Sequence, residues 1–405
     1  MFPWGPLNRE LYKAAAAFAA WRARQVPGPT SDGRGAHADD ILYVSWGRIG
    51  DAVLGAAALD LLRARTGRRV VVVGRPETAA ILAPRADAFV PLPDLRDADA
   101  GARFATALGG PFCAVVGDLH VFHGGLPALA PLFAASVAPH RLLYSGYAGR
   151  GLVAPIRPWP RDATVVPALS KFDKPATRHV LFDTAHYLQA VLAHLGAAEP
   201  TVTLQDLTPT LPGGADDARA DPPTLVCQPF SNNRKKDWPA DAWRALLARF
   251  AHLRIVILGG ASDRARAVEL GVPHAENLCG ATDLPTAIAT IRRATVFVGG
   301  DSGLAHVAAA LRRPTVVVGP SSNLGYFFPY PAELGFTHVH AVHDPRYAAC
   351  SGCITACERE PIWRTQRQGA LCLRTLPVSL VAEALHGALR GAAAAPRREP
   401  ALAGE

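Results

Sequence analysis

Short apolar runs alternate with longer amphipathic stretches along most of the chain, and this alternation predicts parallel α/β units. The first example is ILYVS at 41–45, followed by a glycine turn, a helix at about 51–65 and a second apolar run at 69–73. Short strands joined by a helix form a parallel βαβ unit with a right-handed crossover. The run FCAVVGDLH repeats the pattern of an apolar strand with a polar tip at 112–120. Two further helices are expected in this half, at 126–137 and 180–196.

A second set of units begins at residue 224, where TLVCQPF is expected to form a strand. The polar segment SNNRKKDWP follows it, and Pro239 suits the first turn of a helix over 240–251. The motif VFVGGDSGLAH, which starts at Val296, reads as a strand, a glycine turn and a helix, with another strand after it. The other elements expected here are a strand at 253–260 and helices at 261–270, 284–294 and 377–390.

Proline- and glycine-rich stretches divide the chain into two parallel α/β domains with a cleft between them. We place the domains at 41–205 and 224–376, with a linker at 206–223. Residues 1–40 are expected to form an amphipathic helix and a linker. The C-terminal helix at 377–390 closes the fold, and the low-complexity tail at 391–405 is expected to be disordered.

The N-terminal helix, expected at 7–25, admits two interpretations. Its apolar residues recur at helical spacing, at Leu7, Leu11, Ala14, Phe18 and Trp21. The helix either docks on the body of the protein or lies on an anionic membrane surface. Because the sequence has neither an apolar run long enough for a membrane span nor a clear signal peptide, we expect a cytoplasmic protein. Peripheral contact with the inner membrane is the second part of this expectation.

Composition favours an acidic partner. The 405 residues carry a net charge of +8, which suits nucleic acid, an anionic membrane or a phosphorylated substrate. No recognition helix or aromatic platform is evident, so nucleic acid is not expected as a partner. A non-catalytic nucleotide or nucleic-acid binder remains an alternative, and it would bind in a salt-sensitive manner.

The motif at 296–306 predicts an anion site. Its glycines let the backbone turn sharply, and the helix then begins at Ser302, with its unpaired N–H groups above the strand end. A phosphate-bearing ligand is expected at Ser302, Gly303 and Leu304, with Asp301 and His306 beside it. The alternative is that Ser302 is an ordinary helix cap and that His306 packs on the sheet.

Two other strand ends carry chemistry. Asp51 follows the first strand, where it suits a general base, or a cap of the next helix, or both. The turn before it lacks the third glycine of the dinucleotide fingerprint, which argues against a nicotinamide enzyme. Arg234, Lys235 and Lys236 follow another strand and could neutralise a diphosphate; the alternative is a solvated loop.

Four cysteines form a further cluster, with the spacing C-x2-C-x3-C-x14-C at Cys350, Cys353, Cys357 and Cys372. Four thiolates can bind zinc or iron in a tetrahedral structural site. The alternative is that these are ordinary, partly buried thiols.

Taken together, the motifs resemble glycosyltransferase family 9, the bacterial heptosyltransferases of lipopolysaccharide core assembly. The resemblance spans about residues 41–390, and the cysteine-rich segment has counterparts in many members. The segments that carry it are IGDAVLGAAALDLLRAR (49–65), VVGDLH (115–120), KDWPADAWRALL (236–247) and GGDSGLAHVAAALRRPTVVVGPSS (299–322).

The resemblance implies a GT-B fold, in which two Rossmann-like parallel-sheet domains face each other across a cleft. It also implies inverting, metal-independent transfer of a heptose from ADP-heptose to a lipopolysaccharide core, an anionic glycolipid. Asp51 would deprotonate the acceptor hydroxyl. Lys236 and the helix end at Ser302 to Leu304 would stabilise the departing ADP, with Arg234 nearby, and Asp301 and His306 would shape that site.

On the acceptor side the resemblance implies Asp118 and His120, together with Arg48. Many members have a pair of serines where this chain has Gly47 and Arg48, so Arg48 is expected to replace them by contacting a phosphate. Three alternatives remain: a protein (autotransporter) heptosyltransferase with a cysteine-bound metal, a transferase for another nucleotide sugar, and a two-domain sugar epimerase.

Overall fold

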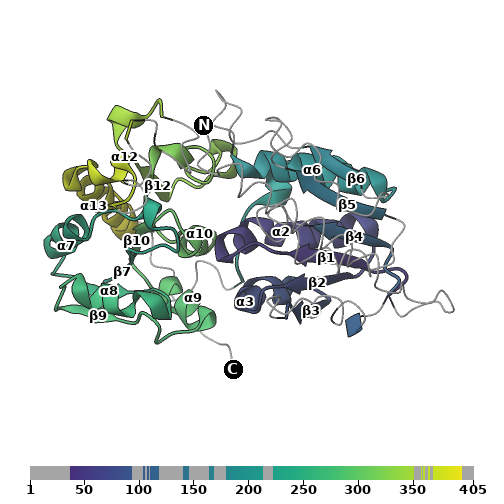
Figure 1. Ribbon diagram of the computed structural model, residues 1–405, viewed down its shortest axis with the longest axis horizontal. Helices are drawn as coiled ribbons and strands as arrows, with labels where there is room; N and C mark the ends of the chain where they lie inside the picture. The colour runs from purple at the N-terminus through teal and green to yellow at the C-terminus, as the bar shows by residue number, and fades with distance from the viewer. Residues whose placement is uncertain are drawn as a thin grey trace. The chain divides into compact units, whose positions relative to one another are not determined.

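The computed structural model consists of two compact units. The described residues up to Thr208, apart from His179, form the first unit, and His179 and the residues from Pro209 onward form the second. The expectation of two parallel α/β domains is confirmed (Figure 1). The structure describes residues 37–93, 104, 107–108, 110–117, 140–145, 164–167, 179–212, 222–350, 357, 359–360, 364 and 368–394.

The first unit is built on a six-stranded sheet in the order β3-β2-β1-β4-β5-β6, and every pairing is parallel. β1 and β2 are buried at every position, as expected of central strands in a parallel sheet with covered faces. The strands are β1 (Ile41–Ser45), β2 (Val70–Gly74), β3 (Ala88–Pro91), β4 (Ala114–Gly117), β5 (His140–Ser145) and β6 (Thr164–Pro167). The described α-helices are α2 (Ile49–Thr66), α3 (Ala79–Leu82) and α6 (Val180–His194).

The second unit repeats this plan with the order β12-β11-β10-β7-β8-β9, again parallel throughout. Its strands are β7 (Thr224–Gln228), β8 (Arg254–Ile257), β9 (Ala275–Asn277), β10 (Val296–Gly300), β11 (Thr315–Val318) and β12 (Val339–Val342). Its described α-helices are α7 (Ala240–Arg249), α8 (Arg264–Glu269), α9 (Leu284–Arg292), α10 (Gly303–Ala310), α12 (Leu371–Arg374) and α13 (Val378–Ala394).

The strand order determines where ligands bind. Both sheets run 3-2-1-4-5-6 when their strands are numbered within each unit. In such sheets ligands bind outside the carboxyl ends of the strands, at the point where the order reverses. That point lies between β1 and β4 in the first unit and between β7 and β10 in the second.

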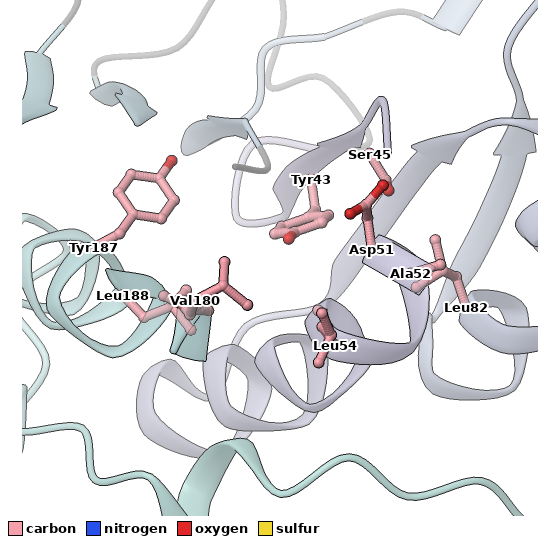
Figure 2. A pocket seen from close by; sticks show the side chains of 11 residues that line it. Tyr43, Ser45, Asp51, Ala52, Leu54, Leu82, Val180, Tyr187 and Leu188 are labelled. Carbon is pink, nitrogen blue, oxygen red and sulfur yellow. Dashed lines mark hydrogen bonds between the residues drawn. The ribbon is translucent and has the colours of Figure 1, made fainter. Parts of the chain in front are cut away.

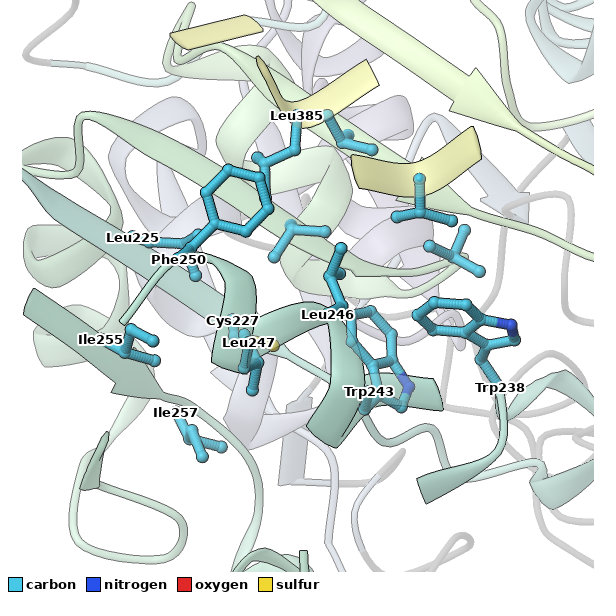
Figure 3. Packing of buried hydrophobic residues seen from close by; sticks show 14 of the residues in the cluster. Leu225, Cys227, Trp238, Trp243, Leu246, Leu247, Phe250, Ile255, Ile257 and Leu385 are labelled. Atoms are coloured by element: carbon cyan, nitrogen blue, oxygen red, sulfur yellow. The ribbon is translucent and has the colours of Figure 1, made fainter. Parts of the chain in front are cut away.

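One face of the second sheet is covered by α7 and α13, which pack against each other over a core of buried aliphatic and aromatic side chains (Figure 3). Trp243 and Phe250 are fully buried in it, and Trp243 meets Trp238 edge to face, with ring centroids 5.0 Å apart. On α13, Leu385 closes this core (Figure 3). Trp238, which follows the basic residues 234–236, is therefore held in this core.

Some predicted boundaries were wrong. The C-terminal helix continues to Ala394, so the tail predicted to be disordered from residue 391 begins as helix. Alanine has the highest helix propensity, so the alanines after residue 390 favour this extension of the helix. The predicted N-terminal linker also ends in ordered contact, because the Cys113 N–H donates to the Asp40 carbonyl at 2.9 Å.

The linker predicted at 206–223 begins inside the first unit, since Gln205–Leu207 forms a 3-10 turn there. The helices predicted at 7–25 and 126–137 lie outside the described residues. Among the described helices, none combines the length and apolar character that crossing a membrane requires.

The α7 layer can be tested by truncating Leu247, which is fully buried. We expect Leu247→Ala to lower the free energy of unfolding by about 2–5 kcal/mol, because a cavity replaces packed side-chain atoms. Urea unfolding measures this change, with the exposed Arg249→Ala on the same helix as control. Equal effects of the two substitutions would contradict this packing.

Candidate active site

Asp51 lies in the first turn of α2, directly after the carboxyl end of β1. Its Oδ2 accepts a hydrogen bond from the Arg48 N–H at 2.8 Å, so the carboxylate caps the helix, as one interpretation of the sequence expected. A Cβ on Gly47 would lie only 2.4 Å from the Asp51 Cβ. Glycine is therefore required at 47 for the backbone to pass this close to the carboxylate.

Asp51 also lines a hollow of about 500 Å³, counting its open mouth (Figure 2). Most of the wall is aliphatic, with Leu54, Leu82, Val180 and Leu188 among the lining residues. Four hydroxyl side chains join it, two from β1 and two from α6: Tyr43, Ser45, Thr184 and Tyr187. A largely apolar hollow with a few polar groups is the usual form of a small-ligand site.

The structure describes only one of the three residues expected on the acceptor side. Arg48 is exposed and stands at the N-cap position of α2, and its backbone N–H holds the Asp51 carboxylate. Asp118 and His120 lie outside the described residues, directly after β4. The sheet order puts the end of β4 next to the end of β1, because these two strands are paired in register.

In the second unit, the structure brings together Asp301 and Lys236 from opposite sides of the point where the strand order reverses. Lys236 follows β7, and Asp301 follows β10, its direct neighbour. Lys236 Nζ lies 3.1 Å from Asp301 Oδ2 and 3.4 Å from the Asp301 main-chain oxygen. The two residues lie 65 positions apart in the chain, and the parallel pairing of β7 with β10 makes them partners.

The Asp301 carboxylate is 5% exposed. Its burial acts to raise its pKa, but the Lys236 charge, a hydrogen bond from Asn323 and the nearby His306 outweigh that effect. The pKa of Asp301 is consequently below its ordinary value, and the group is ionised at neutral pH. Asp301 and Lys236 therefore form an ion pair at the carboxyl end of β10.

Ser302 occupies the N-cap position of α10, but its side chain makes no capping hydrogen bond. The hydroxyl instead donates to Oε1 of Gln228, at the end of β7. The alternative of an ordinary side-chain cap therefore does not hold for this hydroxyl, and the phosphate site expected at Ser302 to Leu304 stays a prediction. The backbone N–H groups at Gly303 and Leu304 begin the helix, where its dipole favours an anion.

His306 is a packed residue of α10, only 3% exposed. Its Nδ1 is hydrogen-bonded to the Tyr330 hydroxyl at 2.8 Å, and its ring stacks on Phe328 with centroids 4.3 Å apart. Burial raises the pKa of Tyr330 well above its ordinary value, so this hydroxyl stays protonated. His306 is thus packed among aromatic side chains, and its expected role of shaping the donor site stays a prediction.

The basic cluster forms a 3-10 turn, Arg234–Lys236, that is pinned on one side by an ion network. Asp237 accepts from the Ser231 N–H at 2.8 Å and pairs with Arg266. Arg266 also lies 3.1 Å from Asp263 and 4.2 Å above the Phe230 ring. The turn is thus part of an ordered network, while the Arg234 side chain itself is exposed.

A second support comes from Gly369 and Ala370, which lie just before Cys372. The Ala370 N–H donates to the Lys235 carbonyl at 3.0 Å. Gly369 has a φ of +81°, and a Cβ there would lie 2.9 Å from the Asp237 carbonyl. Residues far along the chain therefore hold the backbone from which Lys236 extends.

Asn323 is a site residue that the motifs did not identify. It lies in a 3-10 turn (Ser321–Asn323) after β11, and its Nδ2 donates to Asp301 Oδ2. Gln228, the partner of Ser302, was missed as well. The available signal was positional: both are polar residues at carboxyl ends of strands adjacent to β10.

The cysteine cluster is described only in part. Cys350, Cys357 and Cys372 are free thiols, and Cys353 lies outside the described residues. Burial, together with the neighbouring Cys357, raises the pKa of Cys372. Within the described part of the chain, no three His, Cys, Asp or Glu side chains are grouped to hold a metal. The four-cysteine metal site stays a prediction.

Known proteins provide a separate line of evidence. The sequence model of glycosyltransferase family 9 (heptosyltransferase) matches residues 163–348, which include the Lys236 turn and the Asp301 motif. No curated protein matches the chain in sequence.

Several solved structures share the fold. E. coli ADP-heptose lps heptosyltransferase II is 21% identical, with 88% of this chain and 100% of that chain covered and a TM-score of 0.59. A family 9 glycosyl transferase from Veillonella parvula is 17% identical, with 89% and 100% covered and a TM-score of 0.62. E. coli heptosyltransferase WaaC with ADP-2-deoxy-2-fluoro heptose is 19% identical, with 86% and 99% covered and a TM-score of 0.56.

Because neighbouring groups lower the pKa of Asp301, we expect the stability of the protein to depend on pH. Because its pKa is lowered from 3.8, its ionised form stabilises the fold above that value, and the contribution is lost as pH falls through the folded-state pKa. Asp301→Asn should therefore be less stable by about 1–3 kcal/mol at pH 7.

The difference should shrink as pH falls below about 4, as measured by urea unfolding at a series of pH values. Asp241→Asn, at an exposed position, is the control. A stability difference for Asp301→Asn that stays constant with pH would contradict the claim that the ionised form of Asp301 stabilises the fold.

Proposed function

We propose that this chain, which resembles glycosyltransferase family 9, transfers a heptosyl group from ADP-heptose to the core of lipopolysaccharide. The observation that carries the proposal is the Lys236–Asp301 pair in front of the α10 N-terminus. Cation, helix end and strand-order reversal coincide there, as a nucleoside diphosphate requires. The transferase structure with ADP-2-deoxy-2-fluoro heptose supports this donor class.

In the proposed donor site, Lys236 and the backbone N–H groups at the start of α10 bind the diphosphate. As the bond to the sugar breaks, negative charge grows on the departing ADP, and these groups stabilise it without reorganising. Lys236 is suited to this role because Asp301 and the 3-10 turn hold its ammonium at a fixed place, while 23% of its side chain stays exposed. Fixed cations and helix dipoles supply the charge stabilisation that a metal ion supplies in other transferases.

In the proposed acceptor site, Asp51 removes the proton from the attacking hydroxyl. The Arg48 N–H fixes one carboxylate oxygen at the mouth of the hollow, so the carboxylate is oriented before the acceptor arrives. The hydroxyl side chains and aliphatic wall of the hollow suit the polar edges and the C–H faces of a sugar ring. The exposed Arg48 side chain would contact a phosphate of the anionic glycolipid.

The cysteine cluster supports one variant of the proposal, in which the protein holds a structural metal and glycosylates a protein. The proximity of Cys357 to Cys372 favours a structural zinc or iron site completed by Cys350 and Cys353. In that case the acceptor could be a protein. Elemental analysis of the purified protein decides the metal question, and comparison of protein with lipid acceptors decides the substrate.

Replacing the base tests the chemistry. We expect Asp51→Asn to lower transfer at least 100-fold, the lower end of what a general base contributes. Calorimetric titration should show ADP-heptose binding unchanged within about twofold, because Asp51 belongs to the acceptor site. Near-normal turnover by this variant would remove the base assignment. Failure of the wild type to bind ADP-heptose, with tight binding of a UDP- or GDP-sugar, would overturn the donor.

The glycine turn that presents Asp51 offers an independent test. Gly47→Ala should reduce transfer about tenfold or more, since the added Cβ displaces the Asp51 carboxylate and an ångström-scale misplacement costs up to 100-fold. Gly387→Ala is the matched control, because a Cβ there meets nothing within 4 Å. Activity assays at equal folded concentration compare the two. Equal activity of both variants would show that the position of Asp51 does not matter.

A further inference from the structure

A second hollow lies at the carboxyl ends of β10, β11 and β12, with a volume of about 260 Å³ including its mouth. Its polar lining comes from three different strand ends: Asp301 after β10, Asn323 after β11 and His343 after β12. The rest of the wall is mainly apolar, with Val317, Leu324 and Phe328 among its residues. This hollow adjoins the Lys236–Asp301 pair but involves residues outside the recognised motifs.

Two buried atoms of this lining have no hydrogen-bond partner among the described residues: Oδ1 of Asn323 and Nδ1 of His343. Asn323 is 5% exposed, and its amide orientation follows from its contact with Asp301, because only Nδ2 can donate to a carboxylate. Its Oδ1 is thus left as an unused acceptor. Leaving a buried polar atom unpaired costs about 1–3 kcal/mol and is rare in native proteins. Both atoms therefore indicate a ligand that supplies the missing hydrogen bonds.

The chemistry of the lining favours hydroxyl groups. A carbonyl oxygen needs a donor, and burial lowers the pKa of His343, so its imidazole is neutral and offers one donor and one acceptor. A sugar-linked diphosphate carries no proton at neutral pH, so it has none to donate to Oδ1, and its charge would face the Asp301 carboxylate. Hydroxyl groups fit both atoms: one donates to Oδ1, and the same hydroxyl accepts from the imidazole or a second one donates to it. The apolar wall packs on the carbon atoms of the ligand.

We propose that this hollow binds the hydroxyl-bearing exocyclic arm of the transferred sugar, with Asn323 and His343 as specificity-determining residues. The inference rests on the proposed function, since the sugar must be attached to a diphosphate held at Lys236 and α10. A heptose carries one more hydroxyl-bearing carbon on this arm than a hexose. Asn323 and His343 then discriminate between the two sugars, while Asn323 also orients Asp301.

The test measures the dissociation constants of ADP-heptose, ADP-mannose and ADP by calorimetry for the wild type and two variants. His343→Leu removes the imidazole from the hollow and leaves the Asn323–Asp301 contact in place. Asn323→Leu removes the amide from the hollow and also that contact. We expect each to weaken ADP-heptose about 3- to 10-fold, the loss of one hydrogen bond. ADP binding should stay within about twofold for His343→Leu. His340→Leu, at an exposed position of β12, is the control.

The outcomes separate the two claims. Equal weakening of all three ligands, or of ADP-heptose and ADP-mannose alike, would show that these residues only support the fold or Asp301, and would overturn the inference. Unchanged ADP-heptose binding in His343→Leu would mean that the hollow holds only water, with the same consequence. If the wild type binds ADP-heptose no more tightly than ADP, the proposed function itself is contradicted.

Discussion

The candidate donor site depends on one constraint, the compensation of the buried Asp301 carboxylate. An ionised carboxylate removed from water is costly unless it is paired and hydrogen-bonded. Lys236 supplies the charge and Asn323 a hydrogen bond, and each comes from the end of a strand other than β10. The ends of β7, β10 and β11 must therefore stay in register, and a cation is held in front of α10 as a consequence.

In the first unit, the Asp51 carboxylate is also held in place by its surroundings. Asp51 is secured by the backbone at the start of α2, and the close approach of Gly47 leaves no room for a side chain. The carboxylate is thus oriented by the backbone N–H of Arg48 at the start of the helix. Asp301 is held by a buried ion pair and Asp51 by the backbone at a helix start. In the proposed mechanism the first anchors the donor site and the second accepts the proton.

Local patterns in the sequence were sufficient to predict β1, β7, β10 and the helices that follow them, because apolar runs and glycine turns act over a few residues. They also identified Asp51, Lys236 and Asp301, which lie at or within a few residues of the carboxyl ends of β1, β7 and β10. Three edge-side strands had no such pattern: β3, β9 and β12 are short and only partly buried. Propensity alone does not reveal strands of this kind, since pairing with a neighbour stabilises them.

Asn323 and Gln228 escaped prediction for a related reason. Their roles come from contacts between strand ends that are 22 and 74 residues apart in the chain, and only the sheet order makes them neighbours. The Ser302 hydroxyl had two possible partners, and its contact with Gln228 formed in place of the local cap. The central claim is that these strand ends assemble a heptosyl donor site. Mass spectrometry of the product formed from ADP-heptose and truncated lipopolysaccharide tests it most directly. An acceptor heavier by one heptosyl residue is the predicted result, and an unmodified acceptor, or one extended from a different nucleotide sugar, would contradict the account.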